Sequence, residues 1–412
     1  MSSADQPGFP TRIAFTRAQA IVREVAAARR LPAVRTALAR AHGMVLAQEV
    51  VAVLAQPPFD NAAMDGFALR HADLEAAGEA GLQLAGEQFA GRALGLEVAA
   101  GQCIRITTGA PMPAGADTVV MKEDTEATGD RVRFLTAPDK GRHVRRMGED
   151  TAVGERLLRP GDVLTPARIA LAASQGLPEL EVARRPTVAV FASGDELVEP
   201  GMPLLPGQIH NSNRDMLMGL LRAEGLEPVA LPTLPDEMAG ITSALRHAAE
   251  AFDLILTCGG VSAGEKDLLP ELLQRRGRVH FWKSRMKPGM PALFADGGSL
   301  GPALLLCLPG NPVSVLATFL AFARPLLDGM QGRAPRPAWR ARLAAPWAKR
   351  HQRHEFLRGR LSVGDDGQLW VEPNPADGSH RMRAAADSDA LIALPEGLAD
   401  FAAGDVVEVV PY

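Results

Sequence analysis

Three glycine-rich loops each follow a predicted strand in the middle of the chain. They are ASGDEL (192–197), CGGVSAGEKD (258–267) and LPGNPVSV (308–315). Glycine lets the backbone approach a ligand, and backbone N–H groups at the start of the following helix favour a phosphate. The loops therefore predict an anion-binding site, with the candidate residues Gly259, Gly260, Ser262, Gly264, Gly310 and Asn311. The patterns GxGxxG and GxxxxGK[ST] are absent from the sequence, which argues against a standard NAD or ATP site.

Acidic residues lie at the same strand ends, at Glu196, Asp236 and Asp267. Carboxylates beside phosphate loops suit Mg²⁺, which usually takes one or two carboxylates together with ligand phosphates. Each residue also has a structural interpretation, because Asp and Glu stabilise the first turns of helices. Asp236 fits an N-cap as well as it fits a metal ligand, whereas for Asp267 we favour the ligand.

Lysine usage adds an independent hint of an anion site. Only six of the 44 basic residues are lysines, and three of the six (Lys266, Lys283 and Lys287) lie between positions 266 and 287. Lysine is a compact point charge that suits a phosphate or an oxyanion. The alternative is a chance grouping on a solvated face.

A second chemistry is suggested by residues 260–264, which read GVSAG and match the G-x-S-x-G pattern of a hydrolase nucleophile elbow. The downstream partners that Ser262 would need are available in the right order as Asp296 with His351, His354 or His380. No HGGG-type oxyanion segment is present, so we favour a phosphate-loop hydroxyl for Ser262 and keep a serine hydrolase as the alternative. The run KRHQRHEF around the HxxH of the tail predicts a charged, exposed stretch rather than a metal site.

Strands and helices alternate from about Arg184 to Met330, which predicts a parallel sheet with helices on both faces. Strands are predicted at PTVAVFAS, LEPVALPTL, FDLILTC and ALLLCLP, and helices at NRDMLMGLLRAEG, DEMAGITSALRHAAEAF and DLLPELLQRRG, with Asn213 and Asp236 as N-caps. In such a sheet ligands bind beyond the carboxyl ends of the strands. The three loops lie at that edge.

Other patterns predict a multidomain protein. The apolar spacing after Phe15 is helical, with Thr16 as N-cap, and GDVLTPARIALAASQG predicts a further helix. The short runs GQCIRITTG, ADTVVMKED and RVRFLTA predict antiparallel strands. We therefore expect an α-rich elongated domain, an inserted β module, an α/β domain and a small C-terminal β domain, with the bounds 12–56 with 149–183, 57–148, 184–329 and 330–412.

Composition limits the classes of partner. The 412 residues carry a formal charge of −4, which gives no basic field for nucleic acid. Three well-separated cysteines and no signal-like start favour a reducing cytoplasm. Residues 297–323 carry no charge, but PGNP in their middle predicts a buried strand, a tight loop and a helix rather than a membrane span.

Long motifs in a fixed order resemble the molybdopterin molybdenumtransferase family, the MoeA-type enzymes related to the C-terminal part of gephyrin. They are PPFDNAAMDGFA, IRITTGAPMPAGADTVVMKED, VRRMGED, VAVFASGDELVEPG, QIHNSNRDML, ILTCGGVSAGEKD, FWKSRMKPGMP and LPGNPVSV. The resemblance implies a three-layer α/β molybdopterin-binding-like domain. It also implies insertion of molybdate into adenylylated molybdopterin with release of AMP, Mg²⁺ dependence, and an elongated homodimer with a shared active site.

The resemblance also implies functional residues at matching positions. In the β module these are the catalytic groups Asp65 and Thr108, with Asp150 nearby. In the α/β domain the catalytic groups are Glu196, Lys283 and Lys287. The metal ligands there are Asp236 and Asp267, and Pro309 and Pro312 belong to the ligand loop. The tail keeps Ser379 but has Arg383 and Ala384 where the family carries paired serines. The resemblance therefore does not assign the C-terminal domain a share in the site.

Partners and alternatives follow from the same resemblance. We expect small-molecule substrates, a molybdopterin adenylyltransferase and molybdoenzyme maturation proteins as partners, and neither nucleic acid nor a membrane. Besides the transferase and the serine hydrolase, a non-catalytic scaffold is the remaining alternative, because gephyrin-like domains also bind peptides.

Overall fold

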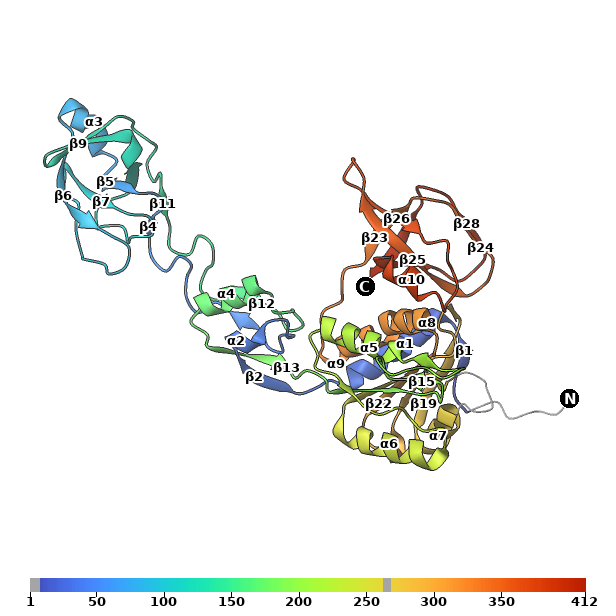
Figure 1. Ribbon diagram of the computed structural model, residues 1–412. Coiled ribbons are helices and arrows are strands. Elements are labelled where there is room, and N and C mark those ends of the chain that lie inside the picture. The colour runs from blue at the N-terminus through green and yellow to red at the C-terminus, as the bar shows by residue number, and fades with distance from the viewer. Residues whose placement is uncertain (1–7, 262–267) are drawn as a thin grey trace. The chain divides into compact units, whose positions relative to one another are not determined.

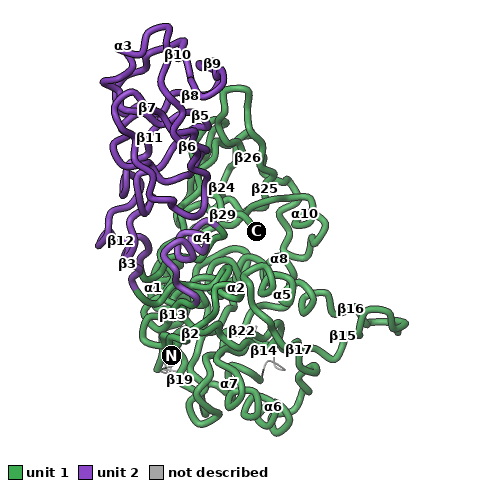
Figure 2. The backbone as a smooth tube through the Cα atoms, turned by 90° about the vertical axis from the view of Figure 1, so that its left-hand side faces the viewer, with its two compact units in different colours: residues 1–48, 160–166, 179–412 green, residues 49–159, 167–178 purple. Residues whose placement is uncertain are grey.

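The computed structural model describes residues 8–261 and 268–412 of the chain. The described chain divides into two compact units (Figure 2). Unit 2 comprises Glu49–Arg159 and Ala167–Pro178. Unit 1 comprises the described residues up to Gln48, together with Pro160–Pro166 and Glu179–Tyr412. The strands predicted for an inserted β module lie in unit 2, whereas the α/β and C-terminal segments lie in unit 1.

A seven-stranded sheet forms the centre of the α/β part of unit 1 (Figure 1). In spatial order its strands are β1 (Thr11–Ile13), β19 (Arg278–Ser284), β21 (Leu293–Asp296), β22 (Leu304–Leu308), β18 (Leu254–Cys258), β14 (Val188–Ala192) and β17 (Val229–Ala230). The four strands predicted from apolar runs are β14, β17, β18 and β22, and they pair in parallel as expected. Strand β21, which the sequence analysis did not predict, is antiparallel to β19 and β22. The connections on either side of β21 are too short for a crossover helix and suit antiparallel pairing.

Helices cover both faces of this sheet, as the alternating pattern predicts (Figure 1). One face carries α6 (Met238–Ala251) and α7 (Leu268–Arg276), and the other carries α1 (Phe15–Ala28), α5 (Ser212–Ala223), α8 (Pro312–Thr318) and α9 (Arg324–Met330). The strands divide their side chains between two hydrophobic cores, because successive residues of a strand point to opposite faces. In β14, Val188, Val190 and Ala192 belong to one core, whereas Ala189 and Phe191 belong to the other.

Helix α1 packs in this α/β core, although its sequence was assigned to a separate α-rich domain. Its buried residues lie in the same core as α9 and β22, and they are Phe15, Ala18, Ile21, Val22 and Ala26. The helix begins at Phe15 after Ala14, which has no capping side chain, so the predicted N-cap at Thr16 is wrong. The N–H of Phe15 instead donates to Oε1 of Glu396 at 2.7 Å. This partner comes from the other end of the chain.

Two further helix starts differ from the predicted caps. Asn211, not Asn213, caps α5, and its side chain accepts a hydrogen bond from the N–H of Arg214 at 3.4 Å. Glu237, not Asp236, occupies the position before α6, without a side-chain capping bond. The predicted N-caps at Asn213 and Asp236 are therefore wrong.

The uncharged segment 297–323 forms strand β22, a loop and helix α8, as predicted. Beyond α8, a π-helical turn (Phe319–Ala323) and α9 continue the helix to Met330. Pro312–Met330 is long and apolar enough to cross a membrane, but 78% of its most apolar stretch is buried inside the protein. Its apolar side chains pack in the core on one face of the sheet, so the segment is a core helix.

The chain from Trp339 onward forms a small closed β barrel, which confirms the predicted C-terminal β domain. Its strands are β23 (Trp339–Leu343), β25 (His354–Val363), β26 (Leu369–Pro373), β27 (Ala390–Leu394) and β29 (Val406–Pro411), with β24 (Trp347–Lys349), β28 (Ala399–Phe401) and α10 (Met382–Ala386) in the connections. Strand β25 closes the barrel because it pairs with both β26 and β27. A short strand of the α/β part, β20 (Met286–Lys287), pairs with the start of β25 and brings Lys287 to the barrel.

Unit 2 is built on a six-stranded sheet (Figure 2). In spatial order its strands are β8 (Thr118–Met121), β5 (Gly66–Leu69), β7 (Gln102–Ile106), β6 (Leu82–Gln88), β10 (Arg131–Phe134) and β9 (Thr125–Thr128). The runs that predicted strands correspond to β7, β8 and β10. Pairing is antiparallel as expected, except that β6 and β7 run parallel.

Shorter elements complete the chain. Two-stranded pairs are β2 (Ala33–Ala37) with β13 (Glu179–Ala183), β3 (Val50–Val51) with β12 (Arg156–Leu158), β4 (Asn61–Ala62) with β11 (Val144–Arg145), and β15 (Leu197–Val198) with β16 (Ile209–His210). Short helices are α2 (Leu38–Ala41) and α3 (Asp73–Ala77), and the helix predicted in GDVLTPARIALAASQG is α4 (Pro166–Ser174).

The run KRHQRHEF is partly buried, contrary to the exposed stretch that its charges predict. Lys349 is fully buried and donates from Nζ to the carbonyl oxygens of His351 and Gly397. The ring of His354 stacks on Phe15 with centroids 4.1 Å apart. Burial, together with the positive charge of Lys349, lowers the pKa of His354 to about 4. The histidine is therefore neutral near pH 7 and packs between the barrel and helix α1.

We expect the variant His354→Phe to be less sensitive to acid than the parent chain. Because the pKa of His354 is lower in the folded chain than the ordinary value of 6.5, only the unfolded chain takes up this proton as the pH falls from 6.5 toward 4. The free energy of unfolding then drops by up to about 3 kcal/mol. Phenylalanine keeps the stacking on Phe15 but has no proton to take up.

Urea unfolding at pH 7.5 and pH 4.5, followed by tryptophan fluorescence, measures this difference. The loss of unfolding free energy between the two pH values should be smaller in the variant by roughly 2 kcal/mol. An equal loss in both proteins would show that His354 does not carry the acid sensitivity.

Candidate functional site

The three glycine-rich loops meet at the carboxyl edge of the sheet in unit 1. Strands β22, β18 and β14 are neighbours and run parallel, so the loops that follow them leave the sheet side by side. The N–H of Gly259 donates to the carbonyl oxygen of Leu308 at 3.0 Å, and the N–H of Ser193 donates to that of Cys258 at 3.0 Å. The edge expected to bind ligand is thus formed as the sequence predicts. Ser262, Gly264, Lys266 and Asp267 lie outside the described residues.

The loop glycines have different structural roles. Gly259 has φ of +96°, and a Cβ at this position would lie 2.4 Å from the carbonyl oxygen of Ser193. Gly260 also has a positive φ, of +70°. Gly310 is exposed, and a Cβ there would meet only Gly259 Cα, at 3.7 Å. Gly259 is therefore required for the packing of the loops on each other, whereas Gly310 leaves backbone open to a ligand.

The start of helix α5 fixes the LPGNP loop, a contact that the sequence analysis missed. Nδ2 of Asn213 donates to the carbonyl oxygen of Gly310 at 2.5 Å. Oδ1 of the same amide is buried and has no hydrogen-bond partner among the described residues. Asn311 and Pro312 begin α8 directly after this loop, and Pro309 is buried beneath it. The sequence did signal a helix start here, because the polar run QIHNSNRD precedes an amphipathic helix. The sequence analysis assigned the N-cap to Asn213 instead of Asn211, so the contact of Asn213 with Gly310 was not expected.

Glu196 and Asp236 project from neighbouring loops at this edge. Glu196 is exposed in the loop after β14, and its carbonyl oxygen accepts from the N–H of Ile209 at 2.9 Å. The N–H of Leu234 donates to the carbonyl oxygen of Ala192 at 2.8 Å, which places the exposed Asp236 beside the end of β14. In the described part of the chain, no three His, Cys, Asp or Glu residues are close enough to hold a metal ion. Mg²⁺ does not need three, because one or two carboxylates with ligand phosphates suffice, so these hard oxygen donors fit it.

Lys283 lies on strand β19 in an unusual backbone conformation. Its φ is +70°, which is uncommon for a residue other than glycine. Nζ of Lys283 lies 4.2 Å from the ring centroid of Trp282, and Nε1 of Trp282 donates to the carbonyl oxygen of Val261 at 3.2 Å. The cation is therefore held over an indole that is itself bound to the CGGV loop.

Lys287 is held by the C-terminal barrel. Its Nζ lies 3.0 Å from Oε1 of Glu355 and 3.3 Å from Oδ2 of Asp377. Burial alone would raise the pKa of Glu355, but hydrogen bonds from His351 and Lys287 outweigh it and hold the pKa below its ordinary value. Nε1 of Trp347 also donates to Glu355, at 3.3 Å. Glu355 and Asp377 were missed because they lie 68 and 90 residues from Lys287.

A second contact joins the barrel to the ligand loop. The N–H of Val313, at the start of α8, donates to the carbonyl oxygen of Ser379 at 3.1 Å. The tail segment that departs from the family pattern at Arg383 and Ala384 thus reaches the loop edge through Asp377 and Ser379. The C-terminal domain contributes to the surroundings of this edge, which the motif comparison alone did not assign to it.

The predicted residues of unit 2 form a separate cluster. Oδ1 of Asp65 accepts hydrogen bonds from the backbone N–H and the hydroxyl of Thr108, each at 2.8 Å. The bond from the backbone N–H is the main reason that the pKa of Asp65 lies below its usual range. Gly66 must be glycine, because a Cβ there would lie 1.9 Å from the carbonyl oxygen of Val120. Asp65 and Thr108 are thus brought together as the motifs imply.

The motif VRRMGED of unit 2 contacts the segment that precedes Asp65 in the sequence. Asp60 accepts from Nη1 of Arg146 at 2.6 Å and from the N–H of Met147 at 2.8 Å. The latter bond lowers the pKa of Asp60 most, with a further contribution from Arg146. Asp150 is exposed and its N–H donates to the carbonyl oxygen of Gln56 at 3.0 Å. The runs PPFDNAAMDGFA and VRRMGED are therefore joined by an ion pair.

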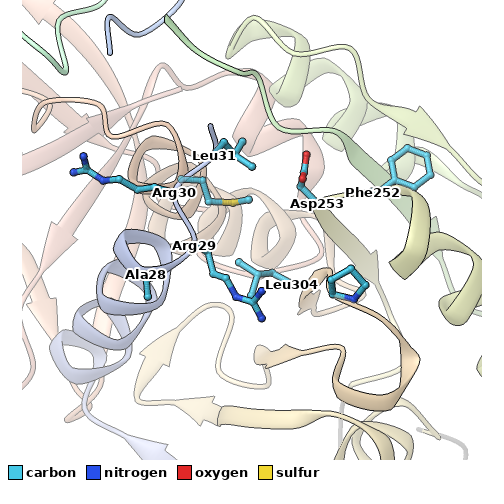
Figure 3. Close-up of a pocket in the computed structure, with 9 residues that line it drawn as sticks. Ala28, Arg29, Arg30, Leu31, Phe252, Asp253 and Leu304 are labelled. Atoms are coloured by element: carbon cyan, nitrogen blue, oxygen red, sulfur yellow. The ribbon is translucent and has the colours of Figure 1, made fainter. Parts of the chain in front are cut away.

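Two hollows of unit 1 lie away from the glycine-rich loops. One, of about 280 Å³, is lined by Ala28–Leu31 after α1, by Phe252 and Asp253 before β18, and by Leu304 at the start of β22 (Figure 3). The other, of about 490 Å³, includes His280 and Asp296. Oδ2 of Asp296 lies 3.2 Å from Nε2 of His280, and Oδ1 lies 3.4 Å from Arg29.

These contacts bear on the hydrolase alternative. The structure pairs Asp296 with an upstream histidine, and His351 contacts Glu355 instead. His354 stacks on Phe15. Asp296 and two of the three candidate histidines, His351 and His354, are therefore engaged elsewhere, whereas His380 is exposed.

Three family models match the chain. They are the MoeA N-terminal region (domain I and II) over residues 13–176, a probable molybdopterin binding domain over residues 189–329, and the MoeA C-terminal region (domain IV) over residues 340–412. The second match covers the sheet with the glycine-rich loops, and the third covers the barrel.

Curated relatives match over most of the chain. The molybdopterin molybdenumtransferase of Haemophilus influenzae is 36% identical over 379 residues, which cover 91% of this chain and 93% of the relative. The molybdopterin molybdenumtransferase 2 of Mycobacterium tuberculosis is 39% identical over 383 residues, which cover 90% and 93%.

Solved structures agree with this assignment. A molybdopterin biosynthesis MoeA protein of Pyrococcus horikoshii OT3 is 28% identical, with a TM-score of 0.81, over 97% of this chain and 100% of that chain. A molybdenum cofactor biosynthesis protein of Pyrococcus furiosus shares the fold at 19% identity, with a TM-score of 0.58 over 97% and 99%. The resemblance drawn from the motifs is confirmed, and the chain belongs to the molybdopterin molybdenumtransferase family of molybdenum cofactor biosynthesis enzymes.

Proposed function

We propose that the chain inserts molybdate into adenylylated molybdopterin and releases AMP, in a reaction that depends on Mg²⁺. The observation that carries the proposal is the edge at which the three glycine-rich loops meet, within the part that matches a molybdopterin binding domain. Lys283 lies next to it over Trp282, and Lys287 contacts Asp377, two residues before the Ser379 that bonds the start of α8. The substrates are polyanionic, so this combination of open backbone and lysine charge fits them.

The loops and lysines divide the work of binding. Backbone N–H groups near Gly260 and Gly310 face the phosphates of the adenylylated pterin, while Lys283 and Lys287 supply charge for the molybdate dianion. Fixed dipoles and cations stabilise an oxyanion without any proton transfer. Glu196, exposed in the loop after β14, would accept hydrogen bonds from donors of the substrate.

Mg²⁺ is assigned to the carboxylates beside the loops. Asp236 and Asp267 would hold the ion, which when bound polarises the phosphate that bridges pterin and nucleotide. Asp236 is exposed at the end of the loop after β17, so it is accessible to a ligand phosphate.

Asp65 and Thr108 lie in unit 2, whereas the lysines and loops lie in unit 1. We propose that the protein forms a homodimer in which one chain supplies Asp65 and Thr108 and its partner supplies the lysines and loops. A two-fold dimer of this kind has two equivalent composite sites. The protein acts in the cytoplasm, where its three buried thiols stay reduced. It receives its substrate from a molybdopterin adenylyltransferase. It passes its product to molybdoenzyme maturation proteins.

The variant Lys287→Gln should weaken apparent molybdate affinity more than pterin affinity. Loss of a charged contact corresponds to a roughly 10- to 100-fold rise in the molybdate concentration at half-maximal rate. The assay follows AMP release at varied molybdate and fixed adenylylated pterin, then the reverse. Lys140→Gln removes an exposed lysine of unit 2 as the matched control, and unchanged molybdate dependence in Lys287→Gln would refute the assignment.

The variant Asp236→Asn should lower Mg²⁺-dependent turnover at least about tenfold with little change in melting temperature, because Asp236 does not cap α6. Glu237→Gln, one residue on and at the cap position, is the matched control and should keep its Mg²⁺ response. The measurements are a Mg²⁺ titration of AMP release and thermal unfolding. If Asp236→Asn keeps the parent's Mg²⁺ dependence, the ligand role is wrong.

Mixing two variants tests the shared site, at a molybdate concentration too low for Lys287→Gln alone to turn over. In a dimer of Asp65→Asn with Lys287→Gln, one composite site carries both substitutions and the other carries neither. Random mixing of equal amounts makes about half of the dimers mixed, so activity should approach roughly a quarter of that of the parent protein. Each variant alone is the control. Activity that stays at the single-variant baseline, after subunit exchange is shown by mass-tagged chains, would mean that Asp65 acts within its own chain.

A further inference from the structure

The two carboxylates that hold Lys287 differ sharply in exposure. The side chain of Glu355 is 3% exposed, whereas that of Asp377 is 54% exposed. Glu355 lies on barrel strand β25, and Asp377 lies in the connection between β26 and α10. The same ammonium thus faces one buried and one solvated anion.

Glu355 is built into the barrel. Its carboxylate takes hydrogen bonds from Lys287, from Nε2 of His351 at 2.9 Å and from Nε1 of Trp347 at 3.3 Å. Removing one partner from a buried ion pair leaves an uncompensated charge, so this contact is costly to break. We therefore expect the ion pair between Glu355 and Lys287 to persist when a ligand binds at Lys287.

Asp377 is held far more weakly. Its carboxylate is solvated and lies 3.3 Å from Nζ, and exposed ion pairs contribute little because water and salt screen them. The surrounding segment is fixed by other bonds: Asn374 Oδ1 accepts from the N–H of Ala376, and the carbonyl oxygen of Gly378 accepts from the N–H of Arg381. The side chain of Asp377 can therefore leave Lys287 without unfolding its loop.

The donor count of the ammonium makes this contact important. A lysine has three N–H donors and no acceptor. In the free chain, Glu355 takes one donor and Asp377 takes a second. An incoming oxyanion therefore meets one cation that faces two carboxylates, and displacement of Asp377 frees a donor and removes one of the two negative charges.

We propose that Asp377 is an internal placeholder for the oxyanion substrate at Lys287. Its carboxylate occupies the ammonium in the free chain and is displaced when molybdate binds, while Glu355 keeps Lys287 in position. This inference rests on the proposed role of Lys287 in binding molybdate. It adds that the Asp377 carboxylate competes with molybdate for Lys287 and so raises the dissociation constant for molybdate.

Direct binding of molybdate tests the proposal without turnover. Equilibrium dialysis of the purified full chain against molybdate, with bound molybdenum measured by mass spectrometry, gives the dissociation constant. Asp377→Asn removes the competing charge and should bind molybdate about two- to fivefold more tightly, the range expected for loss of an exposed ion pair. The gain should shrink as salt is raised.

Three further variants give the control measurements. Asp387→Asn removes a comparably exposed carboxylate that pairs with Arg383 instead, and it should bind as the parent does. Asp377→Glu keeps a competing carboxylate and should stay close to the parent. Lys287→Gln should bind more weakly, and melting temperatures show that each variant is folded.

The outcomes separate the inference from the function on which it rests. If Lys287→Gln weakens binding but Asp377→Asn binds no more tightly than the parent, the placeholder is wrong and the role of Lys287 stands. Equal tightening by Asp387→Asn would also overturn it, since net charge alone would then explain the gain. If Lys287→Gln binds as the parent does, Lys287 does not meet molybdate and both ideas fail.

Discussion

The close backbone approach at the carboxyl edge of the sheet constrains everything around it. Gly259 lies so near Ser193 that no side chain fits between them, and its N–H is bonded to Leu308. The loops after β14, β18 and β22 are therefore pressed together as bare backbone. Among the described residues, these loops supply backbone N–H dipoles and the carboxylate of Glu196, and the nearby lysine cations lie outside the parallel strands. They come from β19 with Lys283 and from β20 with Lys287.

The C-terminal barrel is part of the scaffold that positions those cations. Besides its hold on Lys287, Glu396 of the barrel accepts from the N–H of Phe15 and pairs with Arg285 at 2.7 Å. The Phe15 ring stacks on His354, so helix α1 is bound to both the sheet and the barrel. A buried neutral histidine and a buried glutamate serve opposite needs here. Neutral His354 packs on Phe15 without burying an unpaired charge. Glu355 supplies a fixed anion that positions Lys287.

The sequence was sufficient for features that depend on local pattern, and insufficient for those that depend on distant partners. Apolar runs located β14, β18 and β22, because a buried strand must be continuously apolar. Strand β21 was not predicted, and its antiparallel direction depends on connection length and tertiary context. Helix α1 showed a buried face, but periodicity cannot say what that face packs against. Glu355 lies in a charged run that looks solvated, and only folding reveals that a lysine 68 residues away neutralises it.

The two units differ in the kind of hydrogen-bonding group they present. In unit 2, the hydroxyl of Thr108 gives its proton to Asp65, and the low pKa of Asp65 keeps that carboxylate ionised. The pair therefore presents oxygen acceptors and no free proton, which suits the N–H donors of a pterin or a cation and repels an oxyanion. The edge of unit 1 adds donors to its carboxylates, namely backbone N–H groups and the ammonium ions of Lys283 and Lys287. The donors that an oxyanion needs are therefore concentrated in unit 1, next to the exposed carboxylates of Glu196 and Asp236.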